Sequence, residues 1–235
     1  VFFYQLGLKL GIKKIEKYAK DFYLGKKLGF NLNKERAGLV PSTAWKRKKY
    51  KHDVTTGDLA NISIGQGDLL LTPLQIVSFF ATIANDGYVW RPYIVDHIVK
   101  DGKKLFQNSP KLLHRLQHIK QNNLQKMRNI LFNSVEDKRS TGHKARLFYQ
   151  SVSGKTGSIQ VVSLKKNRNR RVASRMKWQE HAMFAAFSPT ERAEIVVLVL
   201  SENDPEGGGG AQSAPIAKKI LDFYWKTKKN DKHSF

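Results

Sequence analysis

The chain has 235 residues, of which 40% are apolar and 11% aromatic, so it can bury a sizeable core and is not a disordered polymer. It contains no cysteine, which excludes disulfide bonds and thiolate metal sites. Its formal net charge of +23 requires either an anionic partner or a solvated basic surface.

The basic residues gather at residues 46–49, 165–177 and 226–232, between or beyond the apolar segments. Trp178 lies at the edge of the middle stretch, and no platform for stacking bases is visible. We therefore expect no nucleic acid as partner, and a basic nucleic-acid-binding module stays as the non-enzyme alternative. The stretch from Lys165 to Lys177 has almost no apolar anchor, which predicts a poorly packed loop overhanging a cleft.

The first half of the chain predicts helices joined by loops. Residues 2–23 carry apolar residues at helical spacing with lysines between them, which predicts one amphipathic helix or two short ones. Residues 25–60 are rich in Gly, Asn and Lys and predict a long ordered loop. Thr72-Pro73-Leu74-Gln75 is a capping-box pattern that begins a buried helix, and Asn85-Asp86-Gly87 ends it.

The second half predicts mainly strands. Residues 88–106 predict a hairpin that turns at Asp101-Gly102, and residues 112–135 predict another amphipathic helix. Three strands follow, at residues 151–164, 181–187 and 193–201. The third is apolar at every position from Ile195 to Leu200, which predicts a central strand covered on both faces.

The glycine run at residues 207–210 predicts a flexible connector, and Pro215 opens a last helix. This order of elements predicts an α/β (α+β) fold in which helices sandwich an antiparallel sheet. We expect a single domain over residues 1–235. Its parts are a mostly helical region at 1–150, the three strands and last helix at 151–226, and a basic tail at 227–235.

The most informative motif is Lys155-Thr156-Gly157, within the β-prone run from Val152 to Val162. It places a cation, a hydroxyl and a backbone without a side chain next to one another on a strand. That set suits the binding of a carboxylate-bearing acyl donor beside a nucleophilic serine. A Lys-Thr-Gly string alone is usually a surface turn, so the interpretation depends on the strand and on further segments.

Three segments in this order resemble the transpeptidase domain of class B penicillin-binding proteins. Ser63-Ile64-Gly65-Gln66-Gly67, before the capped helix, is similar to the family's Gly-Gln-Gly loop. Ser153 to Ser158 contains its Lys-Thr/Ser-Gly motif. His181 to Pro189, with the apolar strand and Ala214-Pro215-Ile216, resembles its closing hairpin and C-terminal helix. The resemblance implies a penicillin-recognising serine transpeptidase fold.

The family's nucleophile motif, Ser-x-x-Lys, is not found where the chemistry needs it. Ser163-Leu164-Lys165-Lys166 and Ser174-Arg175-Met176-Lys177 match as strings, but both follow the triplet in the basic stretch. A nucleophilic serine must open a buried helix so that a lysine one turn later faces the same hydroxyl. We interpret both serines as loop residues. Ser201-Glu202-Asn203 matches the second motif, Ser-x-Asn/Asp, only as a string at a strand end.

The N-terminal part carries two further resemblances. Residues 29–41, with Trp45-Lys46 after them, are similar to the elongation-specific subfamily, penicillin-binding protein 2. Phe3-Tyr4-Gln5 resembles the residues that follow the family's second motif. We therefore expect an incomplete fold, the C-terminal part of a transpeptidase domain whose nucleophilic serine and lysine base precede Val1.

The resemblance implies a serine-type D-Ala-D-Ala transpeptidase/carboxypeptidase that cross-links peptidoglycan stem peptides during cell-wall elongation and is inhibited by β-lactams. Lys155 would attract the donor's terminal carboxylate and contact the second-motif serine, and Thr156 would bind that carboxylate. Gly157 would let the donor lie along the strand, and the N–H of Ser158 would stabilise the oxyanion. Gln160 is expected to bind substrate.

Other classes share some of these features. Serine β-lactamases and penicillin-sensing domains carry the same triplet and stay as alternatives. His114 and His118 alone have ligand spacing and are expected on a solvated helix face, so we expect no metal and no cofactor. The expected partners are stem peptides, β-lactams, the rod-complex scaffold protein and an elongation glycosyltransferase. The expected location is the periplasm, with a single-pass anchor in the inner membrane.

Overall fold

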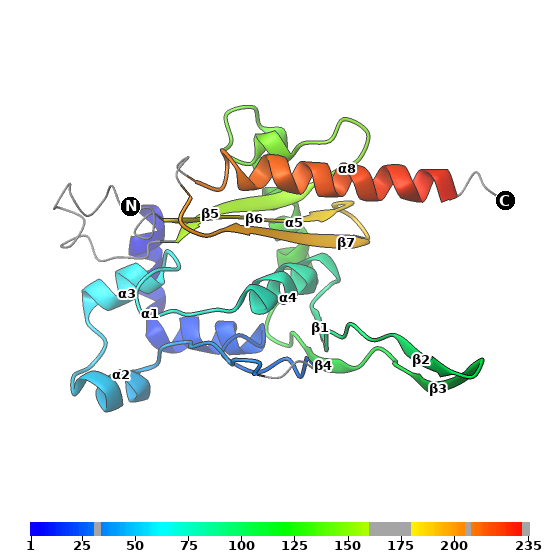
Figure 1. Ribbon diagram of the computed structural model, residues 1–235. Helices are drawn as coiled ribbons and strands as arrows, with labels where there is room; N and C mark the ends of the chain where they lie inside the picture. The colour runs from blue at the N-terminus through cyan, green and yellow to red at the C-terminus, as the bar shows by residue number, and fades with distance from the viewer. Residues whose placement is uncertain (31–33, 160–179, 205–207, 232–235) are drawn as a thin grey trace. The chain divides into compact units, whose positions relative to one another are not determined.

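The computed structural model describes residues 1–30, 34–159, 180–204 and 208–231 (Figure 1). The chain forms two compact units, Val1–Thr82 with Gly87–Lys120 and Ile83–Asp86 with Gln121–Phe235. No helix within the described ranges is both long and apolar enough to cross a membrane.

The first unit begins with α1 (Phe2–Asp21), which is kinked at Gly11. Gly11 has φ +75° and ψ 159°, a conformation that glycine adopts without steric cost. Two helical segments therefore meet at this residue, which matches the predicted pair of short helices.

The long loop predicted for residues 25–60 is wrong in its second half, which contains α2 (Thr43–Tyr50) and α3 (Thr56–Ile62). Both helices begin at side-chain caps. Ser42 Oγ accepts a hydrogen bond from the N–H of Trp45 at 3.1 Å, whereas α3 begins with a capping box. Because α2 is mainly basic and α3 has only 7 residues, neither shows the apolar periodicity on which the prediction relied.

α4 (Pro73–Ala84) confirms the predicted capping box. The N–H of Gln75 donates to Thr72 Oγ1 at 3.2 Å, and the N–H of Thr72 donates to Gln75 Oε1 at 3.1 Å. The Gln75 amide also donates to the carbonyls of Lys26 and Ala37, so this one side chain joins the helix start to the preceding loop.

Two small sheets complete the first unit. β1 (Tyr88–Trp90) pairs with β4 (Leu112–Arg115), and β2 (His97–Lys100) pairs with β3 (Lys103–Gln107). The predicted turn at Asp101-Gly102 is confirmed, with φ of +50° and +71° at its two residues. The helix predicted from residue 112 is wrong at its start, because pairing with β1 makes residues 112–115 a strand.

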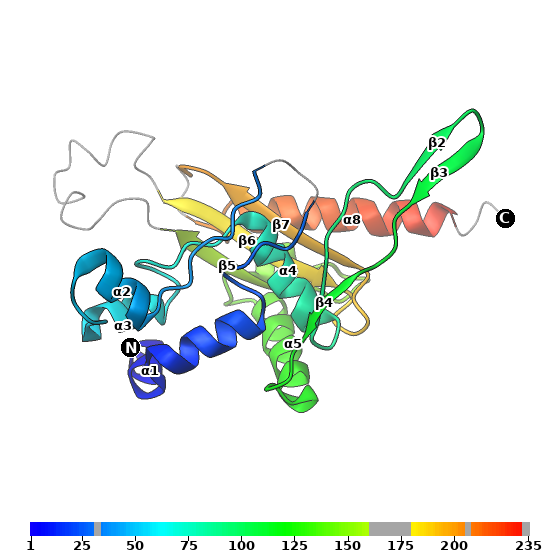
Figure 2. The ribbon, with the colours of Figure 1, turned by 90° about the horizontal axis from the view of Figure 1, so that it is seen from below.

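The second unit is built on an antiparallel sheet in the order β5 (Ser153–Ile159), β6 (His181–Ser188) and β7 (Ile195–Ser201). α8 (Ser213–Asp231) covers one face and α5 (Gln121–Glu136) the other, as the two views show (Figures 1 and 2). This arrangement confirms the predicted sheet between helices. The register pairs Lys155 with Ala185 and Gly157 with Met183, and β5 pairs with β6 alone among the described strands, so the triplet lies on an edge strand.

The central strand is β6, and not the apolar strand at residues 195–201. β6 buries consecutive residues on both faces, including Phe184, Ala185 and Ala186. In β7 only Val197 is buried, and within the described residues β7 pairs with β6 alone. The prediction is wrong for the described sheet because β7 has a paired neighbour on one side only and its side chains other than Val197 are partly exposed.

The core of the second unit lies between the sheet, α5, α8 and the short helix η1 (His143–Ala145). Its buried residues are Val135, Ala145, Leu147, Val152, Phe184, Ala186, Val197, Ala214, Ala217 and Leu221. β5 enters this core at Val152 and Ser153, which are fully buried, and leaves it at the exposed Lys155. The triplet therefore lies where a strand anchored in the core reaches the rim of the sheet.

Candidate active site

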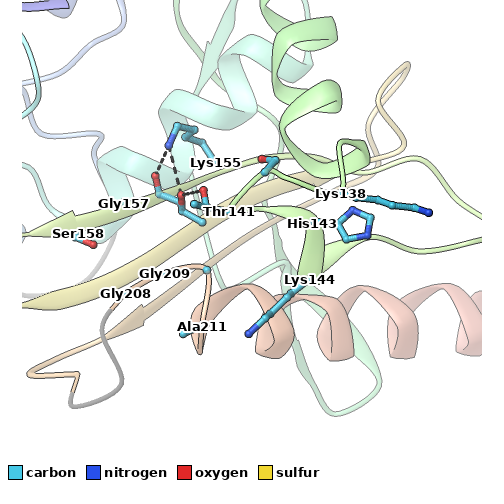
Figure 3. Close-up of a pocket in the computed structure, with 13 residues that line it drawn as sticks. Lys138, Thr141, His143, Lys144, Lys155, Gly157, Ser158, Gly208, Gly209 and Ala211 are labelled. Atoms are coloured by element: carbon cyan, nitrogen blue, oxygen red, sulfur yellow. Dashed lines mark hydrogen bonds between the residues drawn. The ribbon is translucent and has the colours of Figure 1, made fainter. Parts of the chain in front are cut away.

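The triplet lines an open cavity of about 720 Å³ at the edge of the sheet (Figure 3). Ser158 lines the same cavity, so four of the residues selected from the sequence come together in the structure. The other described wall residues are Lys138, Ser140, Thr141, His143, Lys144, Gly208, Gly209, Gly210 and Ala211. This described wall includes lysines but no Asp or Glu, so the cavity is electropositive and suited to an anion.

Lys155 and Thr156 present an ammonium and a hydroxyl to this cavity. Lys155 Nζ lies 2.9 Å from the carbonyl oxygen of Thr156 and 3.4 Å from its hydroxyl. The hydroxyls of Thr156 and Thr141 are 2.7 Å apart, so Thr141 holds the Thr156 side chain in place. Because these partners of Lys155 are neutral oxygens, an incoming carboxylate would meet an ammonium whose charge no described carboxylate balances.

Two serines on the core side hold β5 in register. Ser134 on α5 donates its hydroxyl to the carbonyl of Gly154. The hydroxyl of the buried Ser153 lies 3.2 Å from the carbonyl of Arg128 and 2.9 Å from the hydroxyl of Thr190. The triplet is thus positioned by contacts that do not face the cavity and that no sequence motif predicts.

Close packing explains three glycines near the cavity. A Cβ atom at Gly157 would lie 2.5 Å from Met183 Cε, and one at Gly154 would lie 2.6 Å from Phe184 Cζ. A Cβ atom at Gly209 would lie only 2.0 Å from the carbonyl oxygen of Met183. The predicted connector is therefore, in its described part, a packed wall of the cavity and not a loose link.

The turn after α5, which no sequence motif marks, supplies Lys138, Ser140, Thr141, His143 and Lys144 to the wall. Its sequence signal is weak, because hydroxyl and glycine residues between a helix and a strand are common in ordinary turns. Only the packing of α5 against β5 brings this turn to the triplet.

Several predicted features lie outside the described residues and stay predictions: Gln160, Ser163, Ser174 and the basic stretch at residues 165–177. Ser201 ends β7, as expected, and its hydroxyl lies 3.3 Å from Gln212 Oε1. It is not among the residues that line the triplet cavity.

No three His, Asp or Glu side chains among the described residues are grouped to hold a metal ion. The helix face predicted for His114 and His118 is wrong, because His114 lies on β4 and His118 lies in the bend between β4 and α5. The Nε2 atom of His114 is 2.8 Å from Oδ1 of the buried Asp21, a contact within the first unit that joins the strand to the end of α1.

Comparison with known proteins places this geometry in context. The family model described as the penicillin binding protein transpeptidase domain matches residues 1–222. Peptidoglycan D,D-transpeptidase MrdA of Haemophilus influenzae is 33% identical to the chain over 227 residues, which are 95% of this chain and 34% of that protein. The chain thus spans about a third of the length of such relatives.

Two solved structures of PBP2 are similar to this chain over most of its length. Pseudomonas aeruginosa PBP2 in complex with WCK 5153 superimposes with a TM-score of 0.77 at 29% identity, covering 95% of this chain and 46% of that one. Helicobacter pylori PBP2 in complex with MreC superimposes with a TM-score of 0.75 at 26% identity, covering 95% and 38%.

Proposed function

The chain belongs to the penicillin-binding protein transpeptidase family, and from this membership we propose that the protein is a peptidoglycan D,D-transpeptidase of cell-wall elongation. The observation that carries the proposal is the triplet on its edge strand, where Lys155 and Thr156 line an electropositive cavity. A donor peptide that ends in D-Ala-D-Ala has a terminal carboxylate of the right charge for these two side chains.

In the proposed reaction a serine hydroxyl attacks the penultimate carbonyl carbon of the donor. The C–Oγ ester bond forms, the peptide C–N bond breaks, and the terminal D-Ala leaves with the proton. Lys155 and Thr156 bind the terminal carboxylate, Gly157 lets the donor lie beside β5, and the N–H of Ser158 stabilises the oxyanion. Losing one oxyanion donor typically costs roughly 100- to 1000-fold in rate.

We place the nucleophilic serine and its lysine base before Val1 in the complete protein. The reason is that both Ser-x-x-Lys strings of this sequence, at Ser163 and Ser174, follow the triplet, whereas the family pattern has the nucleophile before it. Water in place of the acceptor amine would make the same site a D-Ala-D-Ala carboxypeptidase.

The remaining assignments rest on resemblance to the elongation-specific subfamily. We propose β-lactams as inhibitors that acylate the same serine, which would make the protein an antibiotic target. The rod-complex scaffold protein and an elongation glycosyltransferase are the proposed protein partners; the MreC complex of the Helicobacter pylori relative supports the first. The proposed location is the periplasm, with a single-pass anchor in the inner membrane.

Labelling of the complete protein with a fluorescent penicillin tests this proposal. A slowly hydrolysed covalent adduct, together with cross-linking of pentapeptide stems, is the expected result. Rapid release of the hydrolysed penicillin would instead indicate a β-lactamase, and a stable adduct without cross-linking would indicate a sensor. Absence of labelling would overturn the proposal.

A further inference from the structure

Three basic side chains, Lys138, His143 and Lys144, form what we call the basic cluster. They line the triplet cavity and also a second cavity of about 690 Å³ next to it. In Figure 3 they lie on the side of the triplet cavity away from Ser158. The cluster therefore borders two openings at once, and the mechanism above uses none of its members.

The lysines of the cluster are not neutralised by the acidic residues nearest to them in sequence. Glu136 Oε2 pairs with Arg146 Nε at 2.6 Å, and Asp137 Oδ2 pairs with Arg139 at 3.1 Å. Arg139 also lowers the pKa of Asp137, so that this carboxylate is already charged and satisfied. Lys138 and Lys144 are exposed and form no ion pair with any described residue.

His143 is held in a fixed orientation. Its Nδ1 atom donates to the carbonyl of Val135 on α5 at 3.0 Å. The ring is half-buried, and its Nε2 atom is left for another partner. Because His143 and Lys144 also belong to η1, packing against the core fixes the backbone of two cluster members.

The position of the basic cluster indicates which substrate peptide it contacts. Thr141, whose hydroxyl is 2.7 Å from that of Thr156, is separated from His143 by one residue. Ser158, whose N–H is the proposed oxyanion donor, lines the cavity on the side away from Lys138 and His143 (Figure 3). A donor whose terminal carboxylate is bound by Lys155 and Thr156 ends at that carboxylate, so a different anionic group at the basic cluster would belong to a second molecule.

We propose that the basic cluster binds a free carboxylate of the acceptor peptide and so selects acceptors that carry one. This inference rests on the proposed transpeptidase function. In the transfer step the acceptor amine nitrogen attacks the ester carbonyl carbon. The C–N bond forms, the C–Oγ bond breaks, and the amine proton returns to the serine oxygen. The cluster takes no part in bond making; it positions the acceptor by charge.

The test uses the complete protein with Lys138→Gln and Lys144→Gln combined, and with the two matched Lys→Arg changes. Lys219→Gln is the control, because Lys219 is exposed on α8 and lines neither cavity. Each protein is given one donor peptide and two acceptor peptides that differ only in a free or an amidated carboxylate. Penicillin acylation and thermal melting are measured in parallel.

We expect the ratio of transfer to the free and amidated acceptors to fall about ten-fold in the double Gln variant, because a charge-assisted contact is lost at two lysines. The Arg variants should keep most of the wild-type ratio, and the control should keep all of it. An unchanged ratio in the double Gln variant would overturn the proposal. A fall in acylation equal to the fall in transfer would assign the cluster to the donor instead.

A second measurement separates this inference from the function on which it rests. Calorimetric titration of the penicillin-acylated protein with the two acceptors reports binding without turnover. Weaker binding of the free-carboxylate acceptor to the double Gln variant supports the cluster, and equal binding to both proteins overturns it. Failure of the wild-type protein to react with penicillin or to cross-link would overturn the proposed function, in which case the calorimetry is run on the unmodified protein.

Discussion

Two lysines, one in each unit, show how the same charge can serve the fold or a ligand. Lys46 on α2 is 5% exposed, and its amine lies 2.7 Å from Asp58 Oδ1 and 2.7 Å from Asp68 Oδ2. Lys155 is exposed, and its described contacts are to a carbonyl and a hydroxyl. The first amine is neutralised by the chain itself, whereas the second keeps its charge for a molecule that enters the cavity.

The titration of the first group follows from its surroundings. Burial alone would lower the pKa of Lys46, but the hydrogen bonds and charges of Asp58 and Asp68 outweigh it and raise the pKa. Burial likewise acts to raise the pKa of Asp58, and contacts with Lys46 and Thr55 outweigh it and lower the pKa. Lys46 and Asp58 therefore both stay charged across the neutral range.

The largest predicted effect concerns Lys155, whose ammonium charge is balanced by no described carboxylate. In the complete protein, Lys155→Ala should slow acylation by a labelled penicillin about 100-fold, because a charged hydrogen bond to the ligand carboxylate is lost. Ser163→Ala and Ser174→Ala are the matched controls and should change the acylation rate less than two-fold. Loss of labelling in the Ser163 variant with labelling intact in Lys155→Ala would show that the wrong motif has been chosen.

Replacing Lys46, whose charge is balanced by Asp58 and Asp68, should lower the stability of the fold instead. Lys46→Met leaves Asp58 and Asp68 facing each other without a cation. Breaking a fully buried pair costs roughly 3–5 kcal/mol, but these carboxylates are partly exposed, so we expect about 2 kcal/mol, or about 5 °C in Tm. Calorimetry would measure this, with the exposed Lys48→Met as control. Equal Tm values for the two variants would contradict a structural role for Lys46.

A smaller effect is expected at Thr141, which supports the Thr156 side chain through a hydrogen bond between two neutral hydroxyls. Thr141→Val removes the hydroxyl that lies 2.7 Å from Thr156 Oγ1 and should slow penicillin acylation about five-fold. Thr141→Ser keeps the hydroxyl and should restore most of the rate. If the Val and Ser variants acylate equally fast, Thr141 does not position Thr156.

The smallest effect is one of pH. The lowered pKa of Asp58 contributes stability that is present above its unfolded pKa, near 4, and is lost as the pH falls through the folded pKa. The raised pKa of Lys46 contributes stability that is present below about 10.4 and is lost as the pH rises through the folded pKa. Denaturant midpoints measured from pH 3 to 11 should fall at both ends, and less so in Lys46→Met. Parallel curves for the two proteins would exclude this linkage.

The sequence predicted the elements that local rules specify and missed those that tertiary packing creates. The capping box at Thr72, the turn at Asp101-Gly102 and the triplet strand each follow from residue chemistry over a few positions. Residues 112–115 fit a helical spacing equally well, and only the partner β1 makes them a strand. The basic cluster lies on a turn, and nothing in its sequence spacing from Lys155 indicates that the two are close. They line one cavity only because α5 packs against β5.

The glycines around the cavity limit how this site can change over evolutionary time. Side chains at Gly154 and Gly209 would overlap the ring of Phe184 or backbone atoms of β6, so substitution there requires β6 to shift, whereas at Gly157 the nearest atom is the flexible end of Met183. Adaptive substitutions, such as those selected by an inhibitor that occupies the cavity, should instead accumulate at the exposed rim, where Lys138 and Lys144 can be replaced without steric cost. The site thus has a sterically constrained floor and a rim that tolerates substitution.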